Sequence, residues 1–138
     1  MITQKLIKLC NAMAEVEGWK PDGNFEKQAK FPSVAYRNHN PGNLRSSPMS
    51  LGQRDGFAYF YNDATGMFAM QWDIMKKCKG ETQSTLNGNS TISDLILIYS
   101  CSTGDEFNNY VKRVCEICSV VFRSPHGNFP GWNLTSLF

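Results

Sequence analysis

The sequence lacks any long apolar run. Its longest, residues 95–99, falls far short of the roughly 20 apolar residues that a membrane-spanning helix needs. The first residues carry Lys5 and Lys8, without the hydrophobic stretch or the small-residue cleavage site of a secretory signal. We therefore expect no stable membrane insertion and synthesis in the cytoplasm without a signal peptide. Any action outside the cytoplasm would then need another carrier.

Charge and histidine are also scarce. A formal net charge of +2 over 138 residues is too small to argue for a nucleic-acid partner. The two histidines, His39 and His126, have no nearby residues at metal-ligand spacing. Nucleotide-binding loops, dinucleotide fingerprints and helix-turn-helix patterns are missing. We therefore expect no metal, no cofactor and no nucleic acid.

The five cysteines do not form a disulfide framework. An odd number without a secretory signal argues for reduced thiols. Cys115 and Cys118 form a CxxC at helical spacing inside an apolar pattern, which favours buried thiols over a zinc or redox site. Cys10, Cys78 and Cys101 lie in or beside apolar stripes, where a thiol is inert. Cysteine–histidine catalysis is therefore disfavoured.

What the chain does contain is a succession of helical patterns separated by turn residues. Its length suits one domain, spanning residues 1–138. Loop-like composition marks residues 18–33 and 80–90, and an irregular tail marks residues 123–138. Apolar recurrence and capping residues predict helices over 2–17, about 64–78 after Asn62 or Asp63, from Thr91 or Ser93 to 101, and about 105–121.

An aromatic segment lies between the first two predicted helices. Residues 57–61 are β-prone and predict a short strand, which we pair with a partner near Leu44 and Arg45. The element order therefore predicts an α+β, mostly α fold with a small antiparallel β-hairpin between the first helix and the C-terminal helices. A cleft between hairpin and helices follows from this order.

Residues 36–45 stand out as a rigid polar loop. They hold three Asn, one Pro and one Gly, which are turn-forming residues, with Arg37 and Arg45 on either side. Amide and guanidinium donors held at fixed positions suit a ligand rich in hydroxyls and amides, such as a sugar. An ordinary structural loop is the alternative.

Glu17 is the candidate catalytic residue. It closes the first predicted helix before Gly18, where the negative end of the helix dipole raises the pKa of a carboxyl. Trp19 could desolvate the carboxyl further. A glycosidase general acid must stay protonated near neutral pH, although a solvated surface Glu is the commoner case. Asp55 and Asp63 are available as a second carboxylate, but a turn and a helix cap explain them equally well.

Several aromatic side chains fall near the predicted hairpin. Most are expected to pack it against the helices, and one or two to line the cleft and stack against sugar faces. The set is Tyr36, Phe57, Tyr59, Tyr61 and Trp72.

These motifs together resemble a known family. A helix ending in Glu-Gly-aromatic, then Arg-Asn-x-Asn-Pro-Gly-Asn-Leu-Arg, an aromatic strand and an Asp-x-x-x-Gly-Met helix is similar to phage and prophage lysozyme-like proteins. These belong to the lysozyme and lytic transglycosylase superfamily. The resemblance covers residues 12 to about 115 and includes Ile98-Tyr99 followed by Gly104-Asp105-Glu106.

The resemblance implies a lysozyme-like fold that cleaves the β-1,4 bond between N-acetylmuramic acid and N-acetylglucosamine in peptidoglycan. The family's essential glutamate carries over to Glu17 and its nearby tyrosine to Tyr99. The family cleaves by hydrolysis or, as a lytic transglycosylase, through attack of the muramic C6 hydroxyl on C1, which leaves a 1,6-anhydro end. Substrate contacts are expected from Asn40, Asn43, Arg45, Tyr59 and Tyr99.

The expected partner is the peptidoglycan glycan strand, reached at the bacterial cell wall or periplasm by a monomer. As an endolysin it would be delivered by phage with a holin, and otherwise with a virion or a secretion apparatus. Two rival interpretations stay open: a non-catalytic virion structural or glycan-binding protein on the same fold, and a small helical interaction module.

Overall fold

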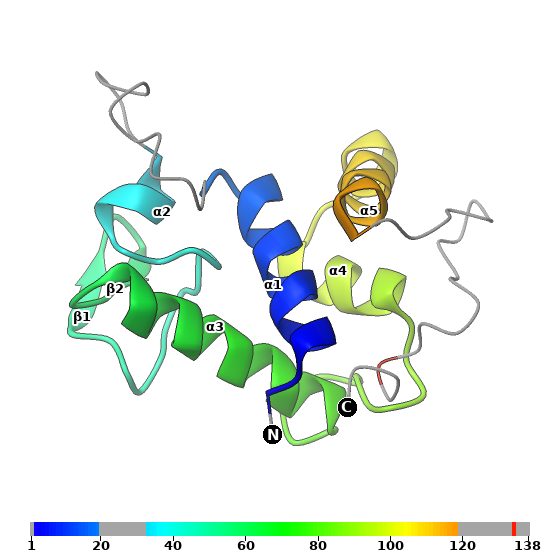
Figure 1. The fold of residues 1–138 in the computed structure, drawn as a ribbon, viewed down its shortest axis with the longest axis horizontal. Helices are drawn as coiled ribbons and strands as arrows, with labels where there is room; N and C mark the ends of the chain where they lie inside the picture. The colour runs from blue at the N-terminus through cyan, green and yellow to red at the C-terminus, as the bar shows by residue number, and fades with distance from the viewer. Residues whose placement is uncertain (1, 20–32, 119–133, 135–138) are drawn as a thin grey trace.

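The computed structural model describes residues 2–19, 33–118 and 134, and is α+β, mostly helical, with one two-stranded antiparallel sheet among these residues. Figure 1 shows α1 (Gln4–Val16) at the centre, between the sheet with α2 (Val34–Arg37) on one side and α4 (Ile92–Ser100) with α5 (Gly104–Cys118) on the other. The long helix α3 (Asp63–Cys78) passes under α1 and connects the two sides.

The main core surrounds α1. Its apolar positions recur at helical spacing, so Leu6, Leu9, Cys10 and Met13 are all fully buried. Helices α3 and α5 both pack against α1, and α4 packs against α5. A smaller apolar cluster, consisting of Leu44, Ala58, Phe60 and Ala69, lies beneath the sheet. Tyr99 packs against both clusters and so connects them.

Side-chain caps begin α3 and α4, at positions that the sequence offered as candidates. Asn62 accepts a hydrogen bond from the backbone N–H of Thr65 and caps α3, one of the two expected cap positions. Thr91 caps α4 in a capping box with Asp94. The observed helices agree with the predicted ones to within three residues at every described end. Residues 119–121 of the last predicted helix lie outside the described residues.

The hairpin is present, but the predicted pairing is wrong. Strand β2 (Phe57–Tyr59) pairs with β1 (Gly52–Arg54), whereas the expected partner was near Leu44 and Arg45. The reason is the turn between the strands. Asp55 and Gly56 both have positive φ, 58° and 81°, which is the two-residue turn that joins adjacent antiparallel strands. Leu44 contributes only a single backbone bond, from Ala58 N to its carbonyl at 2.9 Å.

The one-turn helix α2 was not predicted, because four residues are too few to show a period. Ser33 caps it by accepting a hydrogen bond from Tyr36 N. The predicted loop over 18–33 falls mostly outside the described residues, as does the tail over 123–138 except Leu134. The side chain of Leu134 is buried, and its N–H bonds the Ser90 carbonyl at 2.9 Å. In the described part of the chain, no helix combines the length and apolarity needed to span a membrane.

Candidate active site

Glu17 is held in place by the way α1 ends. It is the C-cap residue, and its N–H bonds the Met13 carbonyl at 3.0 Å. Gly18 follows with φ of 101°, a conformation that favours glycine, and turns the chain back. Trp19 N then bonds the Ala14 carbonyl at 3.0 Å, and the Trp19 ring packs in the main core beside Tyr36. Glu17 is partly exposed at the end of α1.

Two donors converge on the Glu17 carboxyl. The Tyr110 hydroxyl donates to Oε1 at 3.1 Å. The Asn43 amide donates to the Glu17 carbonyl at 3.2 Å and, more weakly, to Oε2 at 3.5 Å. Burial raises the pKa of Glu17, and the charge of Glu106 raises it further, while the bonds from Asn43 and Tyr110 lower it in part. The net effect is a carboxyl that keeps its proton to higher pH than an ordinary Glu.

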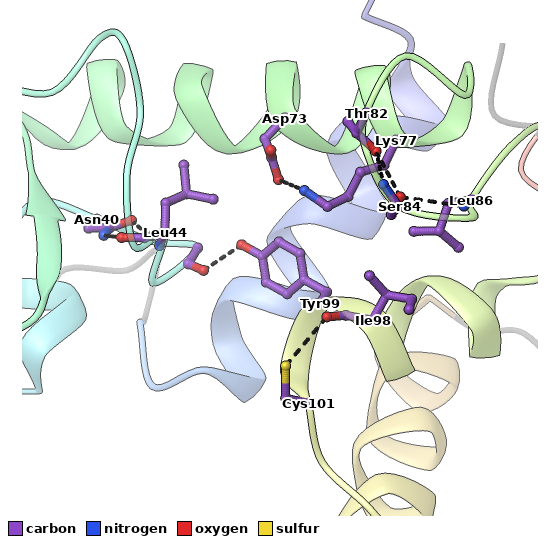
Figure 2. A network of polar contacts seen from close by, with 11 residues as sticks. Asn40, Leu44, Asp73, Lys77, Thr82, Ser84, Leu86, Ile98, Tyr99 and Cys101 are labelled. Atoms are coloured by element: carbon purple, nitrogen blue, oxygen red, sulfur yellow. Dashed lines mark hydrogen bonds and ion pairs between the residues drawn. The ribbon is translucent and has the colours of Figure 1, made fainter.

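A cleft of about 480 Å³ opens beside this carboxyl, between the polar loop of residues 36–45 (the Asn-rich loop), α3 and the end of α4. Figure 2 shows Tyr99, one of the lining residues, pointing from α4 toward the loop, where its hydroxyl donates to the Gly42 carbonyl. Asp73 and Lys77 form an ion pair of 2.6 Å on the α3 wall. The cleft is lined by Glu17, Gly42, Asn43, Leu44, Arg45, Ser46, Phe57, Asp73, Lys77, Ile98, Tyr99, Ser100 and Cys101.

A second cleft, of about 590 Å³, lies on the other side of Glu17, between α1 and α5. Glu17 and Ser100 line both clefts, so the carboxyl stands where the two meet. Glu15 in the second cleft is paired with Arg113 at 3.2 Å. The remaining lining residues are Val16, Glu106, Asn109 and Tyr110.

Three of the five expected substrate-contact residues line the first cleft with Glu17: Asn43, Arg45 and Tyr99. Asn40 does not. It is fully buried, and its amide donates to the carbonyls of Leu44 and Ala58 at 2.9 and 3.0 Å while its Oδ1 accepts from Leu44 N at 3.0 Å. Asn40 therefore holds the loop to the sheet.

Tyr59, the fifth of these residues, also lies outside both clefts. It is on β2, where the guanidinium of Arg54 sits 4.8 Å from its ring centroid.

The two aspartates considered as second carboxylates lie outside both clefts. Asp55 is in the hairpin turn and pairs with Arg37 at 3.6 Å. Asp63, in the first turn of α3, pairs with His39 at 2.9 Å. The carboxylates that do share a cleft with Glu17 are Asp73 in the first and Glu15 and Glu106 in the second. Asp73 and Glu106 were not anticipated, because on isolated helices they look like solvated charges.

Tyr110 is the main site residue that the sequence did not indicate. It lies within the apolar pattern of the helix predicted over about 105–121, and it is buried, being 7% exposed. A signal was available, because a buried tyrosine hydroxyl usually needs a hydrogen-bond partner. What the pattern could not supply was the identity of that partner, Glu17, which is 93 positions away.

The cysteines match the expectation in four of five cases. Cys10, Cys78, Cys115 and Cys118 are buried and free, and burial raises the pKa of Cys78 and of Cys115 to about 12. Cys101 is the exception, because it ends α4 in a left-handed conformation with φ of 54° and is exposed in the first cleft. Within the described ranges no group of His, Cys, Asp and Glu could hold a metal ion.

Comparison of the chain with protein-family models, with curated proteins and with solved structures gave no match.

Proposed function

We propose that this protein has a lysozyme-like fold and cleaves peptidoglycan glycan strands at the β-1,4 bond between N-acetylmuramic acid and N-acetylglucosamine, with Glu17 as general acid. The observation that supports this most directly is the carboxyl itself. It stands between two clefts, burial raises its pKa, and two neutral donors, Asn43 and Tyr110, contact it. That combination suits a group that must be protonated before the reaction and ionised after it.

The acid step follows from these contacts. Protonated Glu17 gives its proton to the glycosidic oxygen as the bond from C1 to that oxygen breaks, and positive charge develops on the sugar. The carboxylate that remains accepts hydrogen bonds from Tyr110 and Asn43, which favour the ionised form. Glu17 then takes a proton from the nucleophile, either water or the C6 hydroxyl of the muramic residue, as that nucleophile attacks C1.

The choice between these nucleophiles depends on a second carboxylate. Hydrolysis in retaining and inverting enzymes uses one, whereas internal attack by the C6 hydroxyl needs none. Asp73 is engaged by Lys77 at 2.6 Å, and Glu15 by Arg113 at 3.2 Å. Glu106 is exposed at the start of α5. This arrangement favours the lytic transglycosylase route, and mass spectrometry of the products distinguishes anhydro ends from reducing ends.

The test is the variant Glu17→Gln, assayed by mass spectrometry of soluble products from purified sacculi. We expect wild-type protein to release muropeptides and the variant to release none above background. The rival interpretations predict that wild-type protein binds sacculi without releasing products, or does not bind them. Full activity of Glu17→Gln would remove Glu17 from the mechanism.

A thermal melt shows that the variant is folded, and it has a predictable pH dependence. Because burial raises the pKa of Glu17, the folded chain holds this proton more tightly than the unfolded chain. Ionisation of Glu17 therefore lowers the free energy of unfolding as the pH rises from the unfolded pKa through the folded pKa. Glu17→Gln has no carboxyl to ionise and so does not lose this free energy. Its melting temperature in alkaline buffer should therefore be at least as high as that of wild type. The difference should disappear below the unfolded pKa.

The proposed place of action is the bacterial cell wall or periplasm, with the protein acting as a monomer. A holin, a virion or a secretion apparatus would deliver it there.

A further inference from the structure

Arg45 differs from the other arginines that the structure describes. Arg37 pairs with Asp55, Arg113 with Glu15 and Glu116, and Arg54 donates to Asn38 Oδ1. The Arg45 guanidinium has no hydrogen-bond or ion-pair partner among the described residues and lies 4.9 Å from the centroid of the Phe57 ring. It lines the first cleft.

Hydrogen bonds hold the backbone at Arg45 in place. Leu44 before it is held at both its N–H and its carbonyl by Asn40, and the Arg45 carbonyl accepts from Gln53 Nε2 at 2.9 Å. The contact with Phe57 restrains the side chain as well. A restrained guanidinium with free donors in a cleft is suited to binding a carboxylate.

The charges on the two sides of Glu17 are opposite. In the first cleft, Lys77 is neutralised by Asp73, so Arg45 is the uncompensated charge among the lining residues apart from Glu17. In the second cleft, Arg113 pairs with Glu15, and the carboxylate of Glu106 has no ion-pair partner within the described part of the chain. An anionic sugar is therefore favoured on the Arg45 side and disfavoured on the Glu106 side.

Resting on the proposed function, we infer that Arg45 binds a carboxylate carried by the glycan and so determines which sugar occupies the first cleft. The sugar that bears the carboxylate lies on the Arg45 side of Glu17, and an uncharged sugar lies on the Glu106 side. In peptidoglycan the carboxylate belongs either to the lactyl group of a peptide-free muramic residue or to the peptide attached to that group.

The test compares Arg45→Gln with wild type on paired substrates. Peptide-free glycan strands are used as they are, and after carbodiimide coupling with ammonia has turned each lactyl carboxylate into a neutral amide. We expect wild type to show about tenfold higher kcat/KM on the free carboxylate, equivalent to about 1.4 kcal/mol. Arg45→Gln should lose this preference, so that its loss of kcat/KM relative to wild type is about tenfold larger on the free-carboxylate strands than on the amidated strands.

Three controls sharpen the result. Arg37→Gln removes an exposed arginine outside both clefts and should keep the wild-type preference. Arg45→Lys keeps the charge but not the planar guanidinium, and should retain part of the preference. Added salt should reduce the preference of wild type and leave that of Arg45→Gln near unity.

A third substrate identifies the source of the carboxylate. If strands that still carry peptides show the Arg45 effect and peptide-free strands do not, the peptide supplies the carboxylate. If peptide-free strands show the Arg45 effect, the lactyl group supplies the carboxylate. An equal loss on free and amidated strands, or no loss on any substrate, would overturn the inference and leave the proposed function intact. A wild-type protein that cleaves none of the substrates would instead overturn the proposed function.

Discussion

The substitution Tyr110→Phe isolates the hydroxyl that contacts the proposed acid. It removes the donor to Glu17 Oε1 at 3.1 Å and a longer bond to the Met13 carbonyl at 3.4 Å, and it keeps the ring in the core. The hydroxyl is a donor throughout the working pH range, because burial raises the pKa of Tyr110 well above its ordinary value. A donor favours the ionised carboxyl, so its loss raises the pKa of Glu17. Catalysis by protonated Glu17 should therefore persist to higher pH.

The size of the effect follows from the geometry. A hydrogen bond to a charged group contributes about 1.5–3 kcal/mol, and we take the lower end because Glu17 is only partly buried. Since one pH unit corresponds to about 1.4 kcal/mol, the basic limb of the kcat/KM profile should move upward by about one unit. The rate at the optimum should also fall, because the carboxyl loses one of the two contacts that orient it.

The assay is the initial rate of muropeptide release across the pH range, with a thermal melt of each variant. Tyr99→Phe is the matched control, because it removes a hydroxyl that contacts Gly42 in the first cleft, which Glu17 also lines, and that makes no hydrogen bond to Glu17. The basic limb of the kcat/KM profile of Tyr99→Phe should lie at the same pH as that of wild type, even if the rate of this variant is lower. A basic limb of Tyr110→Phe that stays in place or moves to lower pH would refute the reasoning.

Two further predictions concern the loop and the cleft. Gly66→Ala should lower the free energy of unfolding by more than about 2 kcal/mol in a denaturant titration, because the new Cβ would stand 1.9 Å from the His39 carbonyl oxygen. Unchanged stability would mean that α3 and the Asn-rich loop are not in this contact. Cys101 should be the described cysteine that a thiol reagent labels first in folded protein, and bound glycan should slow that labelling, because Cys101 is exposed in the first cleft. Labelling at an unchanged rate with saturating glycan would argue against glycan in this cleft.

The sequence predicted those parts of the fold whose determinants are local. Asn62 and Thr91 cap the helices that follow them, and Gly18 ends the first helix, as their types indicate. The predicted partner of β2 was wrong because aromatic residues indicate a strand but do not identify its partner. Asp55-Gly56 specifies a hairpin between the residues on its two sides, and that information was present in the sequence.

The candidate site was predictable where one motif carried it. Glu17 and Asn43 were each predicted from a separate motif. That their side chains approach to 3.5 Å is known only from the structure. The second cleft was not predictable, because it exists only where α1 and α5 pack, and its members lie far apart along the chain. The exposure of Cys101 depends on a left-handed residue at the end of α4, which a thiol in an apolar pattern gives no reason to expect.

The two asparagines of the loop explain how the sheet and the carboxyl are connected. Asn40 is fully buried and bonds both backbone groups of Leu44, so the residues on either side of Leu44 are held relative to β2. Those neighbours are Asn43, which contacts Glu17, and Arg45, which lines the cleft. Asn40→Ala would leave the Leu44 N–H without its partner in the interior, at a cost of about 1–3 kcal/mol, whereas the Leu44 carbonyl would keep its hydrogen bond from Ala58 N. A loss of activity in that variant would therefore reflect a displaced loop, and only a substitution at Asn43 or Arg45 tests contact with the substrate.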